Sequence, residues 1–409
     1  MWEMEMSRYR SFLVSIVVGL AICSTQTGCE QKHSAPRSQS PKFHGTVIVI
    51  GVDAPVSGPL APLGKGIVDS VRLAVGDANR ERQVPGFTFR VEVRDDRASP
   101  AQGVANARAF ISEPDVLGVV GPLNSGVAAA MQPVMGAEHF ALISPANTDP
   151  ALTGADGSLT RPDSTYFRTV ATDAVQGPVA ARYALNSLKA RTVFVVNDAT
   201  TYGLGLSSVF RQEFQTIGGR VVGSGTATSA PESSRALALE IESSGAESVY
   251  FGGEYPAFIP LRKSLAGLGF HGRVLGGDGI STADYVRGVG QAAAGDYATG
   301  VGAPLTSLPS AKGFLKEYQA AGFHDPSGPY GGYAYDSAQV VIHAVQLDIT
   351  GGSLSADPRF DVGTLSQLVD FQGVTGDIWF DGNGDINDQS VTMYEVQNKE
   401  WTPIQIISG

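Results

Sequence analysis

The sequence predicts an α/β fold built from two doubly wound, Rossmann-like lobes joined by a hinge. Short apolar segments of strand length alternate with helix-length segments whose apolar residues follow the period of an α-helix. This alternation runs from residue 46 to about 148 and restarts near 192, after a connection at 150–164 that is rich in Gly, Pro and Asp. Two similar halves indicate two facing lobes, and the cleft between such lobes is the default place for a ligand.

The composition limits the possible partners. The chain has 409 residues, a formal net charge of −11 and a pI of about 5.0, so its length suits two domains of about 150 residues each. Nucleic acid is not expected as a partner, because phosphate backbones require basic patches. Both cysteines, Cys23 and Cys29, precede residue 30, so the folded body is expected to have no disulfide and no cysteine-based metal site.

Residues 1–29 have the pattern of an export signal. A basic flank precedes the apolar run Phe12–Ile22, which is too short for a stable membrane anchor. The residues before Cys29 resemble a bacterial lipoprotein box, in which this cysteine is lipidated, although Gln26 departs from the usual pattern. Simple secretion is the alternative. The polar segment 30–45, with its Ser and Pro residues, is expected to be a flexible tether.

The first lobe is predicted from a run of strands and helices. Strands are expected at Thr46–Val52, Phe87–Val93, Val116–Val120 and Phe140–Ile143, with helices around Ile67–Ala78, from Pro100 to Ser112 and over Gly126–Glu138. The last two strands and the helix between them form a βαβ unit, which implies parallel pairing.

Small polar residues follow these two central strands. Asn124 and Ser125 follow the first, and Ser144, Asn147 and Thr148 follow the second. Ligands of such sheets bind beyond the carboxyl ends of the strands. Ser125 is expected at an N-cap position, where free backbone N–H groups attract a carboxylate or phosphate. Alternatively, Ser125 only caps its helix and Thr148 only shapes a turn.

The second lobe repeats the pattern. Strands are expected at Thr192–Val196, Arg220–Val222, Ser248–Phe251 and Arg273–Leu275, with helices that begin at Thr201 and cover Phe258–Leu268. Past about residue 295 the chain is expected to rejoin the first lobe, with a strand at Tyr297–Val301 and helices at Ala311–Ala321 and Ala334–Val345. The tail is expected to form a hairpin of Gly376–Phe380 with Ser390–Val396. The predicted lobes are 46–166 with 296–372, and 167–295 with 373–409.

Signatures of catalysis are missing from the sequence. The six histidines are scattered, and there is no G-x-S-x-G or H-E-x-x-H pattern. The turn 381–387 has the spacing of a calcium loop at its first positions, but Ile386 replaces the required glycine and Thr392 the closing glutamate. We therefore expect no enzymatic activity, no metal, no cofactor, and binding without turnover.

The chain resembles the type I periplasmic solute-binding proteins of ABC importers, in particular the leucine/isoleucine/valine-binding group with its Venus-flytrap fold. The resemblance spreads over roughly residues 46–400. The matching segments, in the order of the family, are Ser57-Gly58-Pro59, Gly121-Pro122-Leu123-Asn124-Ser125-Gly126, Ile143-Ser144-Pro145-Ala146-Asn147-Thr148, Tyr166-Phe167-Arg168-Thr169, Thr201-Tyr202-Gly203, Tyr250-Phe251-Gly252-Gly253 and Asp325-Pro326-Ser327-Gly328.

The resemblance implies a site for the charged head of an amino acid. Ser125 matches the serine that binds the ligand carboxylate, and Ala146 and Thr148 match positions that bind the ammonium. Tyr202 matches a tyrosine that closes over the ligand, and Asp278 an acidic residue, usually glutamate, that neutralises the ammonium. The expected site is completed by Tyr330, as an aromatic wall, and by Asn124 and Tyr255.

Two departures from the family concern the ligand. Asp278 is one methylene shorter than glutamate, and Leu63 stands where many relatives have an aromatic residue. Alternatively, Tyr202 is only a packing residue at a helix start, and Asp278 only a turn residue in a glycine-rich loop.

The resemblance also implies the biological setting. We expect a monomeric lipoprotein on the outer side of a membrane, which binds a small, branched-chain amino acid and delivers it to the transmembrane subunits of an ABC permease. The first alternative is a sensor subunit of the same fold that binds amides or amino acids for a regulator. A weaker alternative is an enzyme of the cell envelope.

Overall fold

The computed structural model describes residues 46–155, 157, 160–351, 362–368 and 371–408. The predicted export signal, the tether and the lipidation site Cys29 lie outside the described residues. None of the helices within these ranges is both long and apolar enough to cross a membrane.

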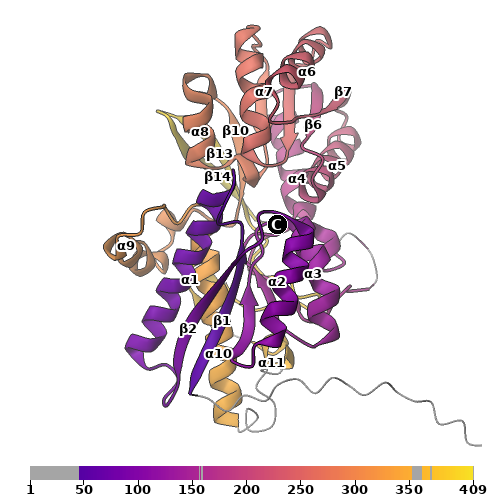
Figure 1. Ribbon diagram of the computed structural model, residues 1–409. Helices are drawn as coiled ribbons and strands as arrows, with labels where there is room; N and C mark the ends of the chain where they lie inside the picture. Colours follow the sequence, from indigo (N-terminus) through magenta and orange to yellow (C-terminus); the bar gives the residue numbers. More distant parts are fainter. Residues whose placement is uncertain (1–45, 156, 158–159, 352–361, 369–370, 409) are drawn as a thin grey trace, which may run out of the picture. The chain divides into compact units, whose positions relative to one another are not determined.

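The first sheet is parallel throughout and has the order β2-β1-β3-β4-β5. Its strands are β1 (Val47–Ala54), β2 (Thr88–Asp95), β3 (Val116–Val120), β4 (Leu142–Ser144) and β5 (Tyr166–Arg168). The main helices that cover it are α1 (Ala61–Glu81), α2 (Pro100–Ser112), α3 (Ser125–Ala137) and α10 (Gly331–Gly351). Helices α1 and α10 pack together, as do α2 and α3 (Figure 1).

Alternation along β1 explains why both faces of the first sheet are covered. Ile48, Ile50 and Val52 belong to the apolar cluster that includes α1 and α10, whereas Val49 packs against the cluster that includes Phe110 of α2. Successive side chains of a strand point to opposite faces. The sheet is therefore buried on both sides, as parallel sheets usually are.

The second sheet has the order β14-β13-β10-β9-β8-β6-β7. Strands β6 to β10 pair in parallel, while β13 and β14 are antiparallel additions at one edge. Its strands are β6 (Thr192–Asn197), β7 (Arg220–Thr226), β8 (Ser248–Gly252), β9 (Arg273–Gly276), β10 (Tyr297–Val301), β13 (Val391–Gln397) and β14 (Glu400–Ile407). Its helices are α4 (Asp173–Arg182), α5 (Thr201–Thr216), α6 (Pro231–Ser243), α7 (Tyr255–Gly267) and α8 (Ala283–Val289), with a π-helical turn at Tyr183–Ser187.

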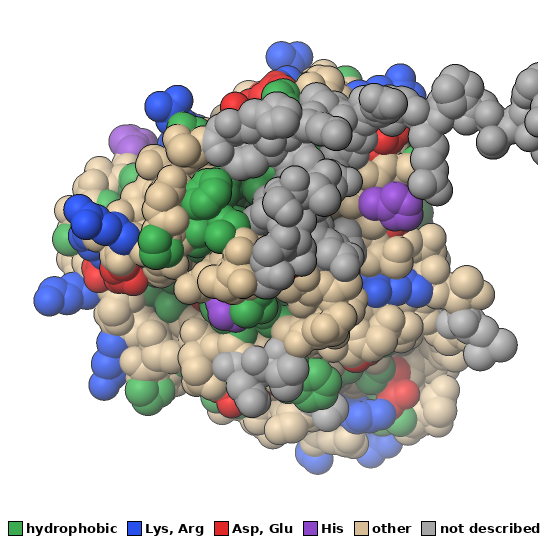
Figure 2. All heavy atoms as spheres, turned by 90° about the horizontal axis from the view of Figure 1, so that it is seen from below, with side chains coloured by type: hydrophobic (Ala, Val, Ile, Leu, Met, Phe, Trp, Pro, Cys, Tyr) green, Lys and Arg blue, Asp and Glu red, His purple; other side chains and the backbone are tan. Residues whose placement is uncertain are grey.

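The remaining elements are short and lie mostly at connections. They are α9 (Ala311–Ala321), α11 (Val362–Ser366), the hairpin of β11 (Phe371–Gly373) with β12 (Gly376–Ile378), and 3-10 turns at Pro150–Leu152, Asp278–Ile280, Gly290–Ala293 and Leu305–Ser307. On the face shown in Figure 2, basic and acidic side chains are scattered among uncharged surface.

The sheets correct the predicted lobe boundaries. Tyr297–Val301 was assigned to the first lobe, but it pairs with β9 and β13 in the second sheet, so the chain returns to the first lobe only after this strand. An apolar strand pattern predicts a strand but not the sheet that it joins. The boundary at 166 cuts through β5, and the boundary at 372 cuts through the hairpin of β11 and β12.

The predicted tail hairpin is also wrong. Gly376–Ile378 pairs with the preceding strand β11, and β13 forms its hairpin with β14 through a tight connection at Asn398 and Lys399. Both of these residues have positive φ angles, 52° and 66°, as two-residue hairpin turns require.

Two buried carboxyl groups, Asp53 and Asp96, lie together at the end of the first sheet. Asp53 accepts a hydrogen bond from Asn106 Nδ2 at 2.7 Å, and Asp96 accepts one from Ala98 N at 2.7 Å. Both side chains are fully buried. Burial raises the pKa of Asp96 to about 6, and burial and the charge of Asp96 raise that of Asp53 well above its ordinary value.

Because the pKa values of this pair are raised, we expect the pair to lower the free energy of unfolding as the pH rises. In the folded protein Asp96 keeps a proton that it releases near pH 4 in the unfolded chain. The stabilising effect of this proton is complete below pH 4 and is lost as the pH rises through about 6. We expect Asp96→Asn to raise the free energy of unfolding by about 1–3 kcal/mol at pH 8 and to have little effect at pH 4. Urea denaturation at both pH values measures this, with the exposed Asp115→Asn as control. An equal effect of Asp96→Asn at the two pH values would contradict the prediction.

Candidate functional site

A small cavity of about 10 Å³ lies where loops from the two sheets meet. It is lined by Leu123, Ser125, Ala146, Tyr202, Glu254, Asp278 and Tyr330. Several of these residues follow β3, β4, β8 and β9 directly, because the carboxyl ends of parallel strands present their loops at one edge. The cavity thus brings together five predicted residues, namely Ser125, Ala146, Tyr202, Asp278 and Tyr330.

Ser125 is the first residue of α3 rather than its N-cap, which corrects the prediction. The N-cap is Asn124, whose side chain makes no capping hydrogen bond. The chain reaches this helix through Gly121, whose φ of 123° favours glycine and whose Cβ would lie 2.0 Å from the carbonyl oxygen of Asp53. The first N–H groups of a helix lack partners within it, so this helix start can bind a carboxylate at Ser125.

The loop after β4 forms the neighbouring wall. Asn147 fixes it, because its Nδ2 donates to the carbonyl of Leu123 at 2.8 Å and its Oδ1 accepts from Tyr166 at 3.1 Å. Ala146 lines the cavity, but Thr148 does not. The Thr148 side chain is 1% exposed, and its hydroxyl lies near the Asp173 carboxylate but outside hydrogen-bonding geometry.

Asp278 begins a 3-10 turn after β9 and is 2% exposed, so it lies inside the cleft rather than at its rim. Its Oδ1 accepts from Tyr202 Oη at 2.7 Å and from Gln176 Nε2 at 3.0 Å, and its Oδ2 accepts from Tyr330 Oη at 2.8 Å. Burial raises the pKa of Asp278, and these hydrogen bonds oppose the shift because they favour the carboxylate. The carboxylate is thus held in a fixed position in the cavity wall.

Asp173 and Gln176, at the start of α4, support Asp278 from behind. Gln176 Nε2 donates to both Asp173 (2.7 Å) and Asp278 (3.0 Å), and Gln176 Oε1 accepts from Asp278 N at 2.9 Å. Asp173 is fully buried. Its burial and the charge of Asp278 raise its pKa well above the ordinary value.

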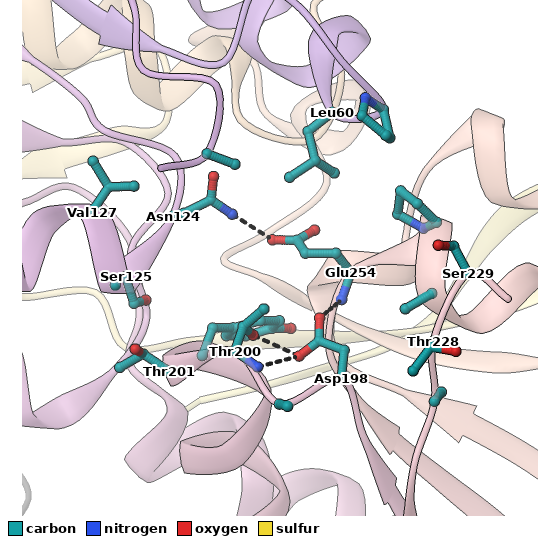
Figure 3. A pocket seen from close by; sticks show the side chains of 18 of the residues that line it. Leu60, Asn124, Ser125, Val127, Asp198, Thr200, Thr201, Thr228, Ser229 and Glu254 are labelled. Carbon is teal, nitrogen blue, oxygen red and sulfur yellow. Dashed lines mark hydrogen bonds between the residues drawn. The ribbon is translucent and has the colours of Figure 1, made fainter. Parts of the chain in front are cut away.

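Glu254 and Tyr255 bring the start of α7 to the first lobe. Tyr255 Oη donates to the carbonyl of Pro59 at 2.5 Å, and Asn124 Nδ2 donates to Glu254 Oε1 at 3.4 Å. Figure 3 shows Asn124 and Glu254 pointing toward each other across a second, outer cleft of about 600 Å³ that is partly open to solvent. Asn124 lines this outer cleft, and Tyr255 lines neither space.

The arrangement suits a ligand with a positive charge. The residues that line the cavity include Glu254 and Asp278 but no Lys or Arg, and Asp173 lies behind them. A buried charge must be paired and hydrogen-bonded, so the carboxylates favour an ammonium while the start of α3 favours a carboxylate. Within the described residues, no group of His, Cys, Asp and Glu side chains is arranged to hold a metal ion.

Sequence reasoning missed Glu254, Asp173 and Gln176. Glu254 follows Gly252-Gly253 at the end of β8, so the rule that found Ser125 could also have found it. Asp173 and Gln176 lie on a helix that follows the crossing between the lobes, and no local pattern marks them. Leu63, expected near the ligand side chain, lines a different cleft together with Trp401 and Pro326.

A pair of doubly wound lobes with a small cavity between their loops, lined by two carboxylates, is the arrangement of a solute-binding protein of the type I fold. The chain belongs to the periplasmic binding protein family, whose family model matches residues 47–400. This membership confirms the predicted fold and family.

Named relatives agree with this assignment. A Leu/Ile/Val-binding protein of Rhizobium johnstonii is 28% identical over 348 residues, which cover 85% of this chain and 91% of the relative. An amino acid binding protein of Pseudomonas aeruginosa is 30% identical over 86% of this chain and 91% of its own. In fold, the chain is similar to the substrate-binding protein LivJ of Streptococcus pneumoniae, solved with isoleucine, with a TM-score of 0.77, 23% identity and coverage of 89% and 100%.

Proposed function

We propose that this protein is the extracytoplasmic binding subunit of an ABC importer and that it binds a small amino acid between its lobes. The observation that carries the proposal is the cavity, in which an anion-binding helix start at Ser125 lies opposite the fixed carboxylate of Asp278. A zwitterionic head group matches both ends. Relatives named as Leu/Ile/Val-binding proteins make branched-chain amino acids the first candidates.

Direct contacts across the cleft give a physical basis for closure. Tyr330, next to α10 of the first lobe, donates to Asp278 of the second, and Tyr255 of the second lobe donates to Pro59 of the first. A ligand that touches both lobes stabilises the closed form by its differential affinity for it. The closed form would then be the one that docks on the permease.

Isothermal titration calorimetry of the ligand-stripped protein tests the proposal. We expect at least one amino acid to bind with a dissociation constant in the micromolar range or below, that is, with about 8 kcal/mol or more. If no amino acid binds, the proposal is wrong. Loss of uptake of the bound amino acid in a strain without this protein would support delivery to a permease, whereas unchanged uptake would support the sensing alternative.

We also propose that the mature protein is anchored through a lipid on Cys29, since small residues precede this cysteine and a polar tether follows it. We expect Cys29→Ala to move the protein from the membrane fraction to the soluble envelope fraction, as measured by immunoblotting after cell fractionation. A Cys23→Ala variant serves as control. A Cys29→Ala protein that stays in the membrane fraction would contradict lipidation.

A further inference from the structure

The carboxylate of Glu254 faces the inner cavity with one oxygen unpaired. Glu254 Oε1 accepts one long hydrogen bond, 3.4 Å from Asn124 Nδ2 (Figure 3). Glu254 Oε2 is shielded from solvent and has no hydrogen-bond partner in the described part of the chain. A Cβ placed on Gly279 would lie 3.2 Å from this oxygen, so Oε2 lies beside the turn that carries Asp278.

The surroundings of Glu254 are unfavourable for a negative charge. Burial raises its pKa well above the ordinary value, and the charges of Asp198 and Asp278 raise it further. The carboxylate of Asp278 has more hydrogen-bond donors than that of Glu254, because Tyr202, Gln176 and Tyr330 all donate to it. Glu254 therefore gains more than Asp278 does from a positive charge placed in the cavity.

An amino acid with an uncharged side chain does not supply that charge. Its ammonium compensates Asp278, and its own carboxylate brings a further negative charge, so the shielded oxygen Oε2 of Glu254 remains beside like charges. A second positive group on the ligand would pair with Glu254 in a site with little competing water, where such a pair is strong. Leu123, which also lines the cavity, offers an apolar wall for the methylene groups between the two charges.

We propose that Glu254 is a specificity-determining residue that selects amino acids with a short, positively charged side chain. This inference rests on the proposed function and refines its ligand class. The small volume of the inner cavity, about 10 Å³, favours a side chain of few atoms. A longer side chain would pass toward the outer cleft, because Ser125, Tyr202 and Glu254 line both spaces.

Calorimetry with pairs of ligands of equal shape tests the inference. The ligand-stripped protein is titrated with 2,4-diaminobutyrate and ornithine, and with their uncharged counterparts norvaline and norleucine. We expect each diamino acid to bind roughly 10- to 100-fold more tightly than its counterpart. We expect Glu254→Gln to bring the ratio of the two affinities within each pair close to one.

A matched control is Glu242→Gln, which makes the same change in charge at an exposed position of α6 and should keep the preference.

Equal or tighter binding of norvaline and norleucine by the unmodified protein would overturn the inference and leave the proposed function intact. A Glu254→Gln variant that loses affinity for both members of a pair by the same factor would also overturn it, because Glu254 would then bind the α-ammonium. The comparison with the unmodified protein remains decisive if the variant does not fold. Absence of binding by every amino acid would instead refute the proposed function itself.

Discussion

Asp278→Asn is expected to weaken amino-acid binding by roughly 30- to several-thousand-fold, which corresponds to about 2–5 kcal/mol. A ligand ammonium leaves water on binding and needs a full opposite charge rather than a dipole. The start of α3 supplies only hydrogen-bond donors, which cannot neutralise an ammonium. The carboxylate of Asp278 can, and Tyr202, Gln176 and Tyr330 hold it in place. Calorimetry of the ligand-stripped variant measures the loss.

The same variant should fold normally. An asparagine amide has the shape of the carboxylate, so it can still accept from Tyr202 and Gln176 and can donate to Tyr330. Removal of a buried charge also lowers a desolvation cost. We therefore expect the thermal midpoint of the ligand-free protein to change little, as measured by circular dichroism.

A neighbouring acid gives the control for this variant. Asp284→Asn removes a charge from α8, where Asp284 pairs with the exposed Arg287, and should leave binding unchanged. If Asp278→Asn binds amino acids as well as the unmodified protein does, the ammonium is bound elsewhere or the ligand has none. If the variant melts early, Asp278 is a structural residue of its turn.

The sequence predicted the parallel cores of both lobes because each strand is a short apolar run followed by a break. Val116–Val120 lies where it was expected, with all its side chains buried. Membership of a sheet was not predictable for Tyr297–Val301, since the partners of this strand are set by chain crossings that leave no local pattern. The prediction of the tail hairpin was wrong for a related reason. The turn at Asn398 and Lys399, which have positive φ angles, joins β13 to β14, whereas the prediction placed the turn of the hairpin in the glycine-rich segment 381–387.

The candidate site was predictable where residues follow strands. Ser125 was found in this way, whereas Ala146 and Asp278 were predicted from the resemblance to the family, and all three line one cavity. The side chains that set the electrostatics of Asp278 were not found, because Gln176 reaches it from a helix 102 residues away in the chain.

The second large effect, on the free energy of unfolding, is expected at a buried ion pair between Arg168 and Asp385. Arg168 ends β5 and is fully buried, and its Nε lies 2.5 Å from Asp385 Oδ1. Its Nη1 donates to the carbonyls of Asn147 (3.2 Å) and Asp149 (2.7 Å), and Thr153 donates to Asp385 Oδ2 at 3.0 Å. The pair thus joins the edge of the first sheet to the segment that crosses toward β13.

Asp385→Ala should lower the free energy of unfolding of the ligand-free protein by about 3–5 kcal/mol, because it leaves a buried guanidinium without its counter-charge. Urea denaturation followed by fluorescence measures this. Asp284→Ala, at the exposed pair with Arg287, is the control and should cost less than about 1 kcal/mol. A loss below about 1 kcal/mol for Asp385→Ala would show that the pair adds little.

The double variant separates the pair from its surroundings. In Arg168→Met with Asp385→Ala no charge is left unpaired, so its cost should be smaller than the sum of the costs of the two single variants. Arg168 also fixes the carbonyls of Asn147 and Asp149, which belong to the loop that carries Ala146 into the cavity. We therefore expect the double variant to bind amino acids more weakly even where it stays folded, whereas Asp284→Ala should bind them normally. Unchanged affinity in the folded double variant would show that the loop after β4 keeps its shape through the hydrogen bonds of Ser144, Asn147 and Tyr166.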